Sequence, residues 1–184
     1  MALRKASSYS KFYTRPYTRK SKKAIKSYIK MVPNSKVTKY RMGDVRGFLK
    51  NEYPIVINIL SKETCQIRDS AIEAARQYLN RFLEVKLGKE FYLEAKVFPH
   101  HIQRENKMIT GAGADRMQTG MSQSFGKTMS RAALVKPNQT VFIVGIKNNK
   151  HEAIARKLIS SIKARLPCGV ATQTIYSKLP LKQS

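Results

Sequence analysis

The sequence predicts an α+β fold: a two-layer sandwich of two helices on a mixed β-sheet, with a basic extended N-terminal arm and a long Gly-rich internal loop. Segments with strand and helix patterns follow one another as β-α-β-loop-β-β-α-β from residue 53 onward. The first 50 residues lack an apolar period, and residues 111–131 hold four of the nine glycines. The length of 184 residues suits one folded domain. We therefore bound the arm at residues 1–50, the α+β domain at residues 51–184 and its internal loop at residues 99–127.

The first half of the domain has the pattern of a strand, a helix and a second strand. YPIVINIL, residues 53–60, is rich in β-branched residues and predicts a strand that extends as far as Thr64. A helix is predicted over residues 67–88, where Gly88 is placed to stop it. Residues 90–98 alternate apolar and charged side chains, as a half-buried strand does, before Pro99. The predicted apolar face of the helix is Ile72, Ala75, Leu79 and Phe82.

The second half has the pattern of two strands, a helix and a last strand. Residues 128–135 and 140–146 flank KPNQ, whose turn-forming residues predict a hairpin. Asn149 precedes Glu152 by three residues, which is the spacing of a reciprocal cap at a helix start. The helix that follows ends at a proline and a glycine, and residues 170–176 form the last strand. Its predicted apolar face is Ile154, Leu158 and Ile162, and the residues that end it are Pro167 and Gly169.

The charge of the chain indicates a polyanionic partner. The sequence has 36 Lys and Arg against 11 Asp and Glu, a net charge of +25. A compact domain with this charge repels itself unless a polyanion neutralises it, and counterion release makes nucleic acid the usual polyanion. An anionic membrane surface is the competing partner. However, the N-terminus lacks the apolar core of a signal peptide, and the longest apolar stretch is far shorter than the about 20 residues of a membrane span.

The N-terminal arm combines this charge with aromatic rings. Residues 1–50 contain 15 Lys or Arg and one acid, Asp44. The arm is either a solvated disordered tail or a segment that folds against RNA, with cations on phosphates and rings stacked on bases. The interleaved rings favour the second interpretation, and in the free protein we expect the arm to be largely unstructured. The rings are Tyr9, Phe12, Tyr13, Tyr17, Tyr28 and Tyr40.

The Gly-rich stretch GAGADRMQTGMSQSFGKTMSR, residues 111–131, comes close to a phosphate-binding loop. A Walker A loop needs a glycine five positions before Gly126, but Met121 occupies that position and Gly120 lies one place too early. The residues after Thr128 have a strand pattern, whereas a Walker A loop leads into a helix. We therefore expect no nucleotide binding. The stretch is either a surface loop without a role or a loop whose backbone passes close to RNA.

Residues that could form a catalytic or metal site are sparse. Cys65 and Cys168 are too few for a disulfide framework, so we interpret them as buried thiols in a reducing compartment, with a single bridge as the alternative. His100 and His101 are adjacent, and in a strand they would point to opposite faces rather than share a metal. C-x-x-C and H-E-x-x-H motifs are absent from the sequence.

The acids also favour structure over catalysis. Most of the 11 acids are expected to pair with cations on helices, as Glu73 does with Arg76. Asp115 is the exception, because it lies in the Gly-rich stretch beside Arg116. A catalytic role is one interpretation, but orienting Arg116 or ligating a phosphate-bound Mg²⁺ is simpler. The sequence therefore predicts that this chain is not an enzyme.

Several stretches resemble one family of ribosomal proteins. They are RENKMITGAGADRMQTGM (104–121), FGK (125–127), CQIRDSAIEAAR (65–76), FPHHIQRENK (98–107), RPYTR (15–19) and SKVTKYRMG (35–43). The family is called L-sixteen in bacteria and L-ten, eukaryotic-type, in archaea and eukaryotes. The resemblance runs from about Arg15 to Tyr176. GAGADRMQTGM is typical of the archaeal and eukaryotic branch, and the length suits an archaeal member.

The resemblance implies a structural role in the large ribosomal subunit, in the cytoplasm, without membrane contact or homo-oligomer formation. Family members bind large-subunit rRNA, contact neighbouring ribosomal proteins and help to shape the aminoacyl-tRNA site. Their internal loop reaches toward the peptidyl-transferase centre and the peptidyl-tRNA. No cofactor is expected, apart from Mg²⁺ ions that bridge rRNA phosphates. The alternative classes are an RNA-modifying or nucleotide-using enzyme and, more distantly, a DNA-packaging protein.

We expect two groups of contact residues. The rRNA contacts are Arg4, Lys5, Arg15, Tyr17, Arg19, Lys20, Lys22, Lys23, Lys36, Lys39, Arg41, Arg68, His100 and His101. The residues expected to act near the tRNAs are Arg104, Lys107, Gly111, Gly113, Asp115, Arg116, Gln118, Gly120 and Lys127.

Overall fold

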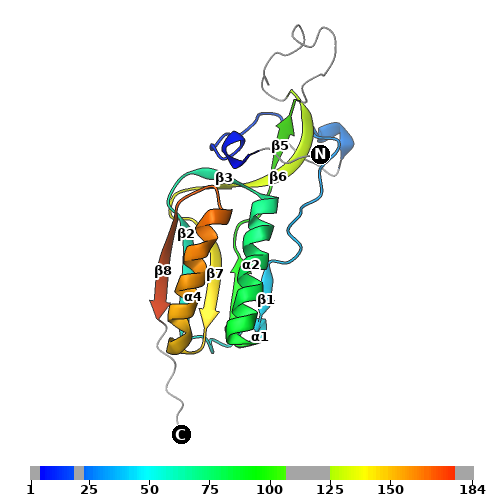
Figure 1. The fold of residues 1–184 in the computed structure, drawn as a ribbon. Helices are drawn as coiled ribbons and strands as arrows, with labels where there is room; N and C mark the ends of the chain where they lie inside the picture. The colour runs from blue at the N-terminus through cyan, green and yellow to red at the C-terminus, as the bar shows by residue number, and fades with distance from the viewer. Residues whose placement is uncertain (1–4, 19–22, 107–124, 177–184) are drawn as a thin grey trace.

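The computed structural model describes residues 5–18, 23–106 and 125–176, and its architecture belongs to the predicted α+β class (Figure 1). Its strands are β1 (Arg41–Gly43), β2 (Ile55–Ser61), β3 (Cys65–Arg68), β4 (Phe91–Ala95), β5 (His101–Glu105), β6 (Lys127–Val135), β7 (Thr140–Ile146) and β8 (Val170–Tyr176). Its helices are α1 (Val45–Leu49), α2 (Asp69–Leu87) and α4 (Asn149–Ile162), with 3-10 turns η1 (Ala6–Ser8), η2 (Ala24–Lys26) and η3 (Lys163–Arg165). The described residues thus hold three α-helices rather than the predicted two, because α1 is too short to show a helical period.

The larger sheet has five strands in the order β1-β4-β7-β2-β8, and every neighbouring pair is antiparallel. The predicted mixed sheet is therefore wrong. β2 and β4 run in the same direction on either side of α2 in the chain, but β7 lies between them and is antiparallel to both. In the same way, β2 lies between β7 and β8. The two β-α-β units are interleaved, so no parallel strands become neighbours.

β3, β6 and β5 form a second, three-stranded antiparallel sheet at the end of the molecule where α2 begins (Figure 1). The predicted hairpin between residues 128–135 and 140–146 is wrong, because β6 pairs within this sheet whereas β7 joins the larger one. The KPNQ turn binds the end of β2 instead. Asn138 N donates to Ser61 O at 2.8 Å, and Ser61 N donates to Gln139 O at 3.0 Å. The chain leaves the larger sheet after β2 and returns to it after β6, and these two crossings lie side by side.

Helices α2 and α4 cover one face of the larger sheet (Figure 1). As predicted, α2 stops at Gly88, which has a φ of 66° and donates its N–H to Glu84 O. A positive φ is the conformation for which glycine is favoured at a helix end. The apolar face of α2 is confirmed except for Phe82, which is half-buried against Tyr78, and Leu83 takes its place in the core. The buried apolar residues are Ile72, Ala75, Leu79, Leu83 and Leu87.

The face of α4 differs from the prediction in two respects. Ala155, Ile159 and Ile162 are buried, whereas Ile154 is 36 % exposed, so the buried face is rotated by about one residue. The predicted reciprocal cap is also wrong: Asn148 is the N-cap and makes no side-chain cap bond. Glu152 is drawn away from the helix start, because it accepts bonds from Arg156 and from the Tyr176 hydroxyl of β8.

The fold buries both cysteines and contains no membrane span among the residues it describes. Cys65 and Cys168 are free, and each is at most 6 % exposed, so the interpretation as buried thiols is confirmed. The Ser61 hydroxyl lies 4.0 Å from the Cys65 sulfur. In the described parts of the chain, none of the helices combines the length and the apolar composition of a bilayer span.

Candidate nucleic-acid interface

One buried glutamine fastens the first part of the arm to the three-stranded sheet. Gln66 Nε2 donates to Lys11 O at 2.8 Å and to Tyr13 O at 2.9 Å. The backbone N–H of Gln66 donates to Ser10 O at 2.8 Å, and its Oε1 accepts from Gln103 Nε2 at 3.3 Å. Gln66 is 7 % exposed, so removal of its amide would leave arm carbonyls with no equivalent partner. The arm backbone thus pairs with β3, through an antiparallel bridge between Lys11 and Cys65.

A second part of the arm, residues 31–38, is held by side chains of β6 and α2. Each of four bonds joins one backbone group of the arm to one side chain of the body, at distances of 2.6–3.3 Å. They run from Thr128 Oγ1 to Met31 O, from Arg131 Nε to Pro33 O, from Lys36 N to Asp69 Oδ2, and from Thr38 N to Glu73 Oε2. Because the backbone supplies these bonds, cationic side chains such as Lys36 and Lys39 face outward, whereas Ile29 and Val37 are buried.

The outward side chains of the arm are cations and rings. The Arg68 guanidinium lies 4.8 Å from the centre of the Tyr9 ring, and the Arg15 guanidinium lies 5.0 Å from that of Tyr13. Both distances are within the range of cation–π contacts. Exposed rings next to cations suit stacking on unpaired bases and contact with phosphates. The exposed large apolar residues of the arm are Phe12, Tyr13, Tyr17, Ile25, Tyr28 and Met31.

Strands β5 and β6 hold the two ends of the internal loop side by side. Glu105 is paired with Lys127 at the end of this ribbon, and Arg104 Nη1 donates to Gly126 O at 3.0 Å. Arg104 Nε is buried and has no hydrogen-bond partner among the described residues. The ribbon lies at the end of the molecule that also carries the arm (Figure 1). Residues 107–124 of the loop lie outside the described residues.

Comparison with known proteins decides the family. The family described as "Ribosomal protein L16p/L10e" matches residues 14–173 of this chain. The chain belongs to this family. The predicted resemblance is thereby confirmed, and with it a structural rather than enzymatic protein of the large ribosomal subunit.

Archaeal relatives of the family match nearly the whole chain. The "Large ribosomal subunit protein uL16" of Methanoculleus marisnigri is 42 % identical over 145 residues, which cover 78 % of this chain and 79 % of that protein. The protein of the same description from Staphylothermus marinus is 39 % identical over 168 residues, covering 91 % and 90 %. That of Thermofilum pendens is 40 % identical over 176 residues, covering 94 % and 98 %. The archaeal character predicted for this L16p/L10e chain agrees with these relatives.

The predicted contact residues of this L16p/L10e chain differ in accessibility. Exposed ones are Lys5, Tyr17, Lys23, Lys36, Lys39, Arg41, His100 and Lys127, and half-buried ones are Arg15, Arg68 and Arg104. His101 is 4 % exposed, so we leave it out of the interface. Arg41 is bonded to Glu94 and lies in β1, at the edge of the larger sheet rather than in the three-stranded sheet. Outside the described residues lie Arg4, Arg19, Lys20, Lys22, Lys107, Gly111, Gly113, Asp115, Arg116, Gln118 and Gly120.

Two residues that organise this interface escaped the sequence analysis. Gln66 and Arg131 bind backbone carbonyls that lie 55 and 98 residues away in the chain. For Gln66 there was a usable signal, since a polar residue stands between the apolar Cys65 and Ile67 in a short strand. For Arg131 no signal was available, because a basic residue is ordinary in a chain with 36 of them.

The structure strengthens the expectation that the chain binds no nucleoside triphosphate. Lys127 and Thr128 belong to strand β6, whereas the Lys-Thr pair of a Walker A loop begins a helix. We expect equilibrium dialysis with ATP or GTP and Mg²⁺ to detect no binding at micromolar concentrations. Micromolar binding that disappears in Lys127→Ala would contradict this prediction.

The docking of the arm leads to a revised expectation for the free protein. Gln66→Leu keeps the volume of the side chain but removes its two hydrogen bonds to the arm, so tryptic cleavage after Lys11 should become roughly tenfold faster. Gln173→Leu, on the exposed face of β8, should leave the cleavage rate unchanged. Equal cleavage of Gln66→Leu and the parent protein would instead support an arm that is unstructured in the free protein.

Proposed function

We propose that this ribosomal protein binds large-subunit rRNA through the arm and the three-stranded sheet. One observation supports this most strongly: the arm is fastened by its backbone groups, through Gln66 and Arg131, so that its rings and cations are presented together on one end of the molecule. A formal charge of +25 supplies the counterion-release term that drives such binding. Phosphate contacts would position the protein, and stacked rings would engage unpaired bases.

The proposal includes a role for the internal loop near the tRNAs. By resemblance to the family, the protein helps to shape the aminoacyl-tRNA site and sends its loop toward the peptidyl-transferase centre and peptidyl-tRNA. The paired ends of the loop at Glu105 and Lys127 support this, because a two-stranded base can set the direction of a loop beyond the body. The proposed partners are therefore large-subunit rRNA, both tRNAs and neighbouring ribosomal proteins.

A salt titration of rRNA binding tests which end of the molecule holds the RNA. Replacing Lys5, Lys11 and Lys26 together by alanine removes three exposed cations of the arm. The slope of log K against log salt for deproteinised large-subunit rRNA should then fall in magnitude by about two to three, since each phosphate contact contributes about 0.7–0.9.

The matched control removes three exposed cations from the opposite end of the molecule. Lys150 lies in the first turn of α4, and Lys86 and Lys89 lie at the C-terminal end of α2 (Figure 1). This triple alanine variant should keep the parent slope. Equal loss of slope in both triple variants would show binding through net charge alone, and the proposed interface would be wrong.

A further inference from the structure

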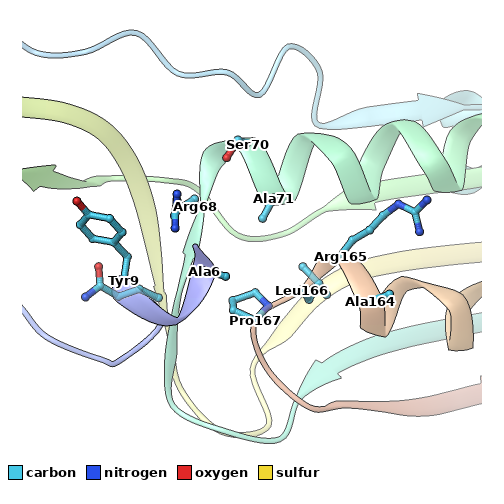
Figure 2. A pocket seen from close by; sticks show the side chains of 10 residues that line it. Ala6, Tyr9, Arg68, Ser70, Ala71, Ala164, Arg165, Leu166 and Pro167 are labelled. Carbon is cyan, nitrogen blue, oxygen red and sulfur yellow. The ribbon is translucent and has the colours of Figure 1, made fainter. Parts of the chain in front are cut away.

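A pocket of about 320 Å³ lies where the arm meets the body, between η1, the start of α2 and the segment that follows η3 (Figure 2). Small or flat apolar side chains form much of its wall, and they come from all three segments. They are Ala6 of the arm, Ala71 of α2, and Ala164, Leu166 and Pro167 after α4. The volume is at the lower end of the range for small-molecule sites. Ala6 and Tyr9 of the arm complete the wall of the pocket.

The polar part of the wall is cationic. Arg68 lines the pocket with its guanidinium over the Tyr9 ring at 4.8 Å, and Arg68 Nη2 is held by Lys5 O at 2.7 Å. The lining contains no Asp or Glu. Asp69 is the nearest acid in the chain, but it is 1 % exposed and accepts from the Lys36 N–H on the arm. An occupant with negative charge is therefore favoured over a neutral or cationic one.

These two features together select the chemical class of the occupant. A bare phosphate would gain little from five apolar side chains, and an apolar side chain of another protein would place an uncharged surface against the positive charge of Arg68. A nucleotide satisfies both, because a flat base can lie against Pro167 and Leu166 while its phosphate faces Arg68 and the first turn of α2.

We propose that this pocket receives one nucleotide of the large-subunit rRNA, turned out of its stack. The inference rests on the proposed rRNA-binding function and adds a specific base-binding site to it. Bases extruded in this way are read by stacking between aromatic or apolar side chains, and here the Arg68–Tyr9 pair and the Pro167 ring supply the two flat surfaces.

The test fills the pocket from two directions without changing charge. Ala164→Trp fills it from the segment after α4 and Ala6→Trp from the arm, and both alanines are exposed enough to spare the core. Ala153→Trp, exposed on α4, is the matched control. Each filled variant should bind deproteinised large-subunit rRNA about tenfold more weakly than the control does, as for the loss of one stacked base. Chemical probing should show one base that is protected by the parent and by the control but reactive with both filled variants.

A photo-crosslinker placed at position 164 of the full chain in assembled subunits identifies the occupant. Crosslinking to one rRNA nucleotide is the expected result. Crosslinking to another ribosomal protein, or to the chain's own N-terminal residues, would overturn the inference, as would unchanged rRNA affinity in both filled variants. Failure of the parent protein to bind rRNA at all would instead refute the proposed function, so the two failures are distinguishable.

Discussion

Glu73→Ala is expected to lower the free energy of unfolding by about 3–5 kcal/mol, because it leaves a buried guanidinium without its counter-charge. Glu73 and Arg76 are each 8 % exposed and form a two-pronged pair, with Arg76 Nη2 at 2.6 Å and Nε at 2.8 Å from the carboxylate. The same carboxylate accepts from the backbone N–H of Thr38 at 3.3 Å and from its hydroxyl at 3.1 Å. Loss of Glu73 therefore weakens both α2 and the segment that leads into β1. Urea unfolding followed by circular dichroism measures the change.

Two further variants test whether the expected loss comes from the burial of the Glu73–Arg76 pair. Glu84→Ala, on the exposed side of the same helix, should change stability by less than about 0.5 kcal/mol. Replacing Glu73 and Arg76 together by leucine should be less destabilising than Glu73→Ala, since neither buried charge then lacks a partner. A loss below about 1 kcal/mol in Glu73→Ala would mean that water reaches and solvates Arg76.

The same contact makes stability depend on pH. The Arg76 guanidinium lowers the pKa of the Glu73 carboxyl from its ordinary value near 4.5 to about 2. Because the folded-state pKa is the lower one, this stabilisation is fully present above about pH 4.5 and is lost as the pH falls toward 2. Glu73→Ala should therefore destabilise the protein most near neutral pH, and the difference from the parent should shrink below pH 4.

Replacing residues 108–121 by a short Gly-Ser linker should leave incorporation into large subunits nearly intact but slow peptide-bond formation about tenfold to a hundredfold. The linker removes only Arg116 from the loop cations, because Arg104, Lys107 and Lys127 lie outside the replaced stretch. Each loop residue that becomes fixed on binding costs roughly 1–2 kcal/mol of backbone entropy, so the loop should add little net affinity. Its expected role is to place Arg116 and the nearby backbone at the tRNA ends, where a small displacement alters substrate positioning.

The measurement compares purified variant and parent subunits in peptide-bond formation and in tRNA footprinting at the peptidyl site. Arg116→Ala with the loop length intact separates the side chain from the backbone. Normal translation by the linker variant would show that the loop has no role near the tRNAs, and our assignment of Arg116 would then be wrong. Failure to assemble would make the loop an anchor instead.

Elements with a strong local pattern were predictable from the sequence. The 19-residue helix α2 was found with its Gly88 stop, and β8 was found with its boundaries, because each depends on neighbouring residues. The family resemblance was equally accessible, since GAGADRMQTGM is a contiguous signature. The charge of +25 was sufficient to indicate a polyanionic partner, because the net charge is a sum over residues and does not depend on the fold.

Only the tertiary structure decided which strands became neighbours and where the arm lies. The insertion of β7 between β2 and β4 turned the expected mixed sheet into an antiparallel one, and strand patterns do not encode pairing order. The arm has no apolar period, and its docking bonds use backbone carbonyls and N–H groups, which nearly every residue has. What selects those carbonyls is the position of Gln66 and Arg131 on the three-stranded sheet, and the docked arm completes the wall of the pocket beside Arg68. The local sequence can mark Gln66 as an unusual polar residue in a strand, but it does not show which carbonyls 55 or 98 residues away Gln66 and Arg131 bind, because folding alone brings these groups together.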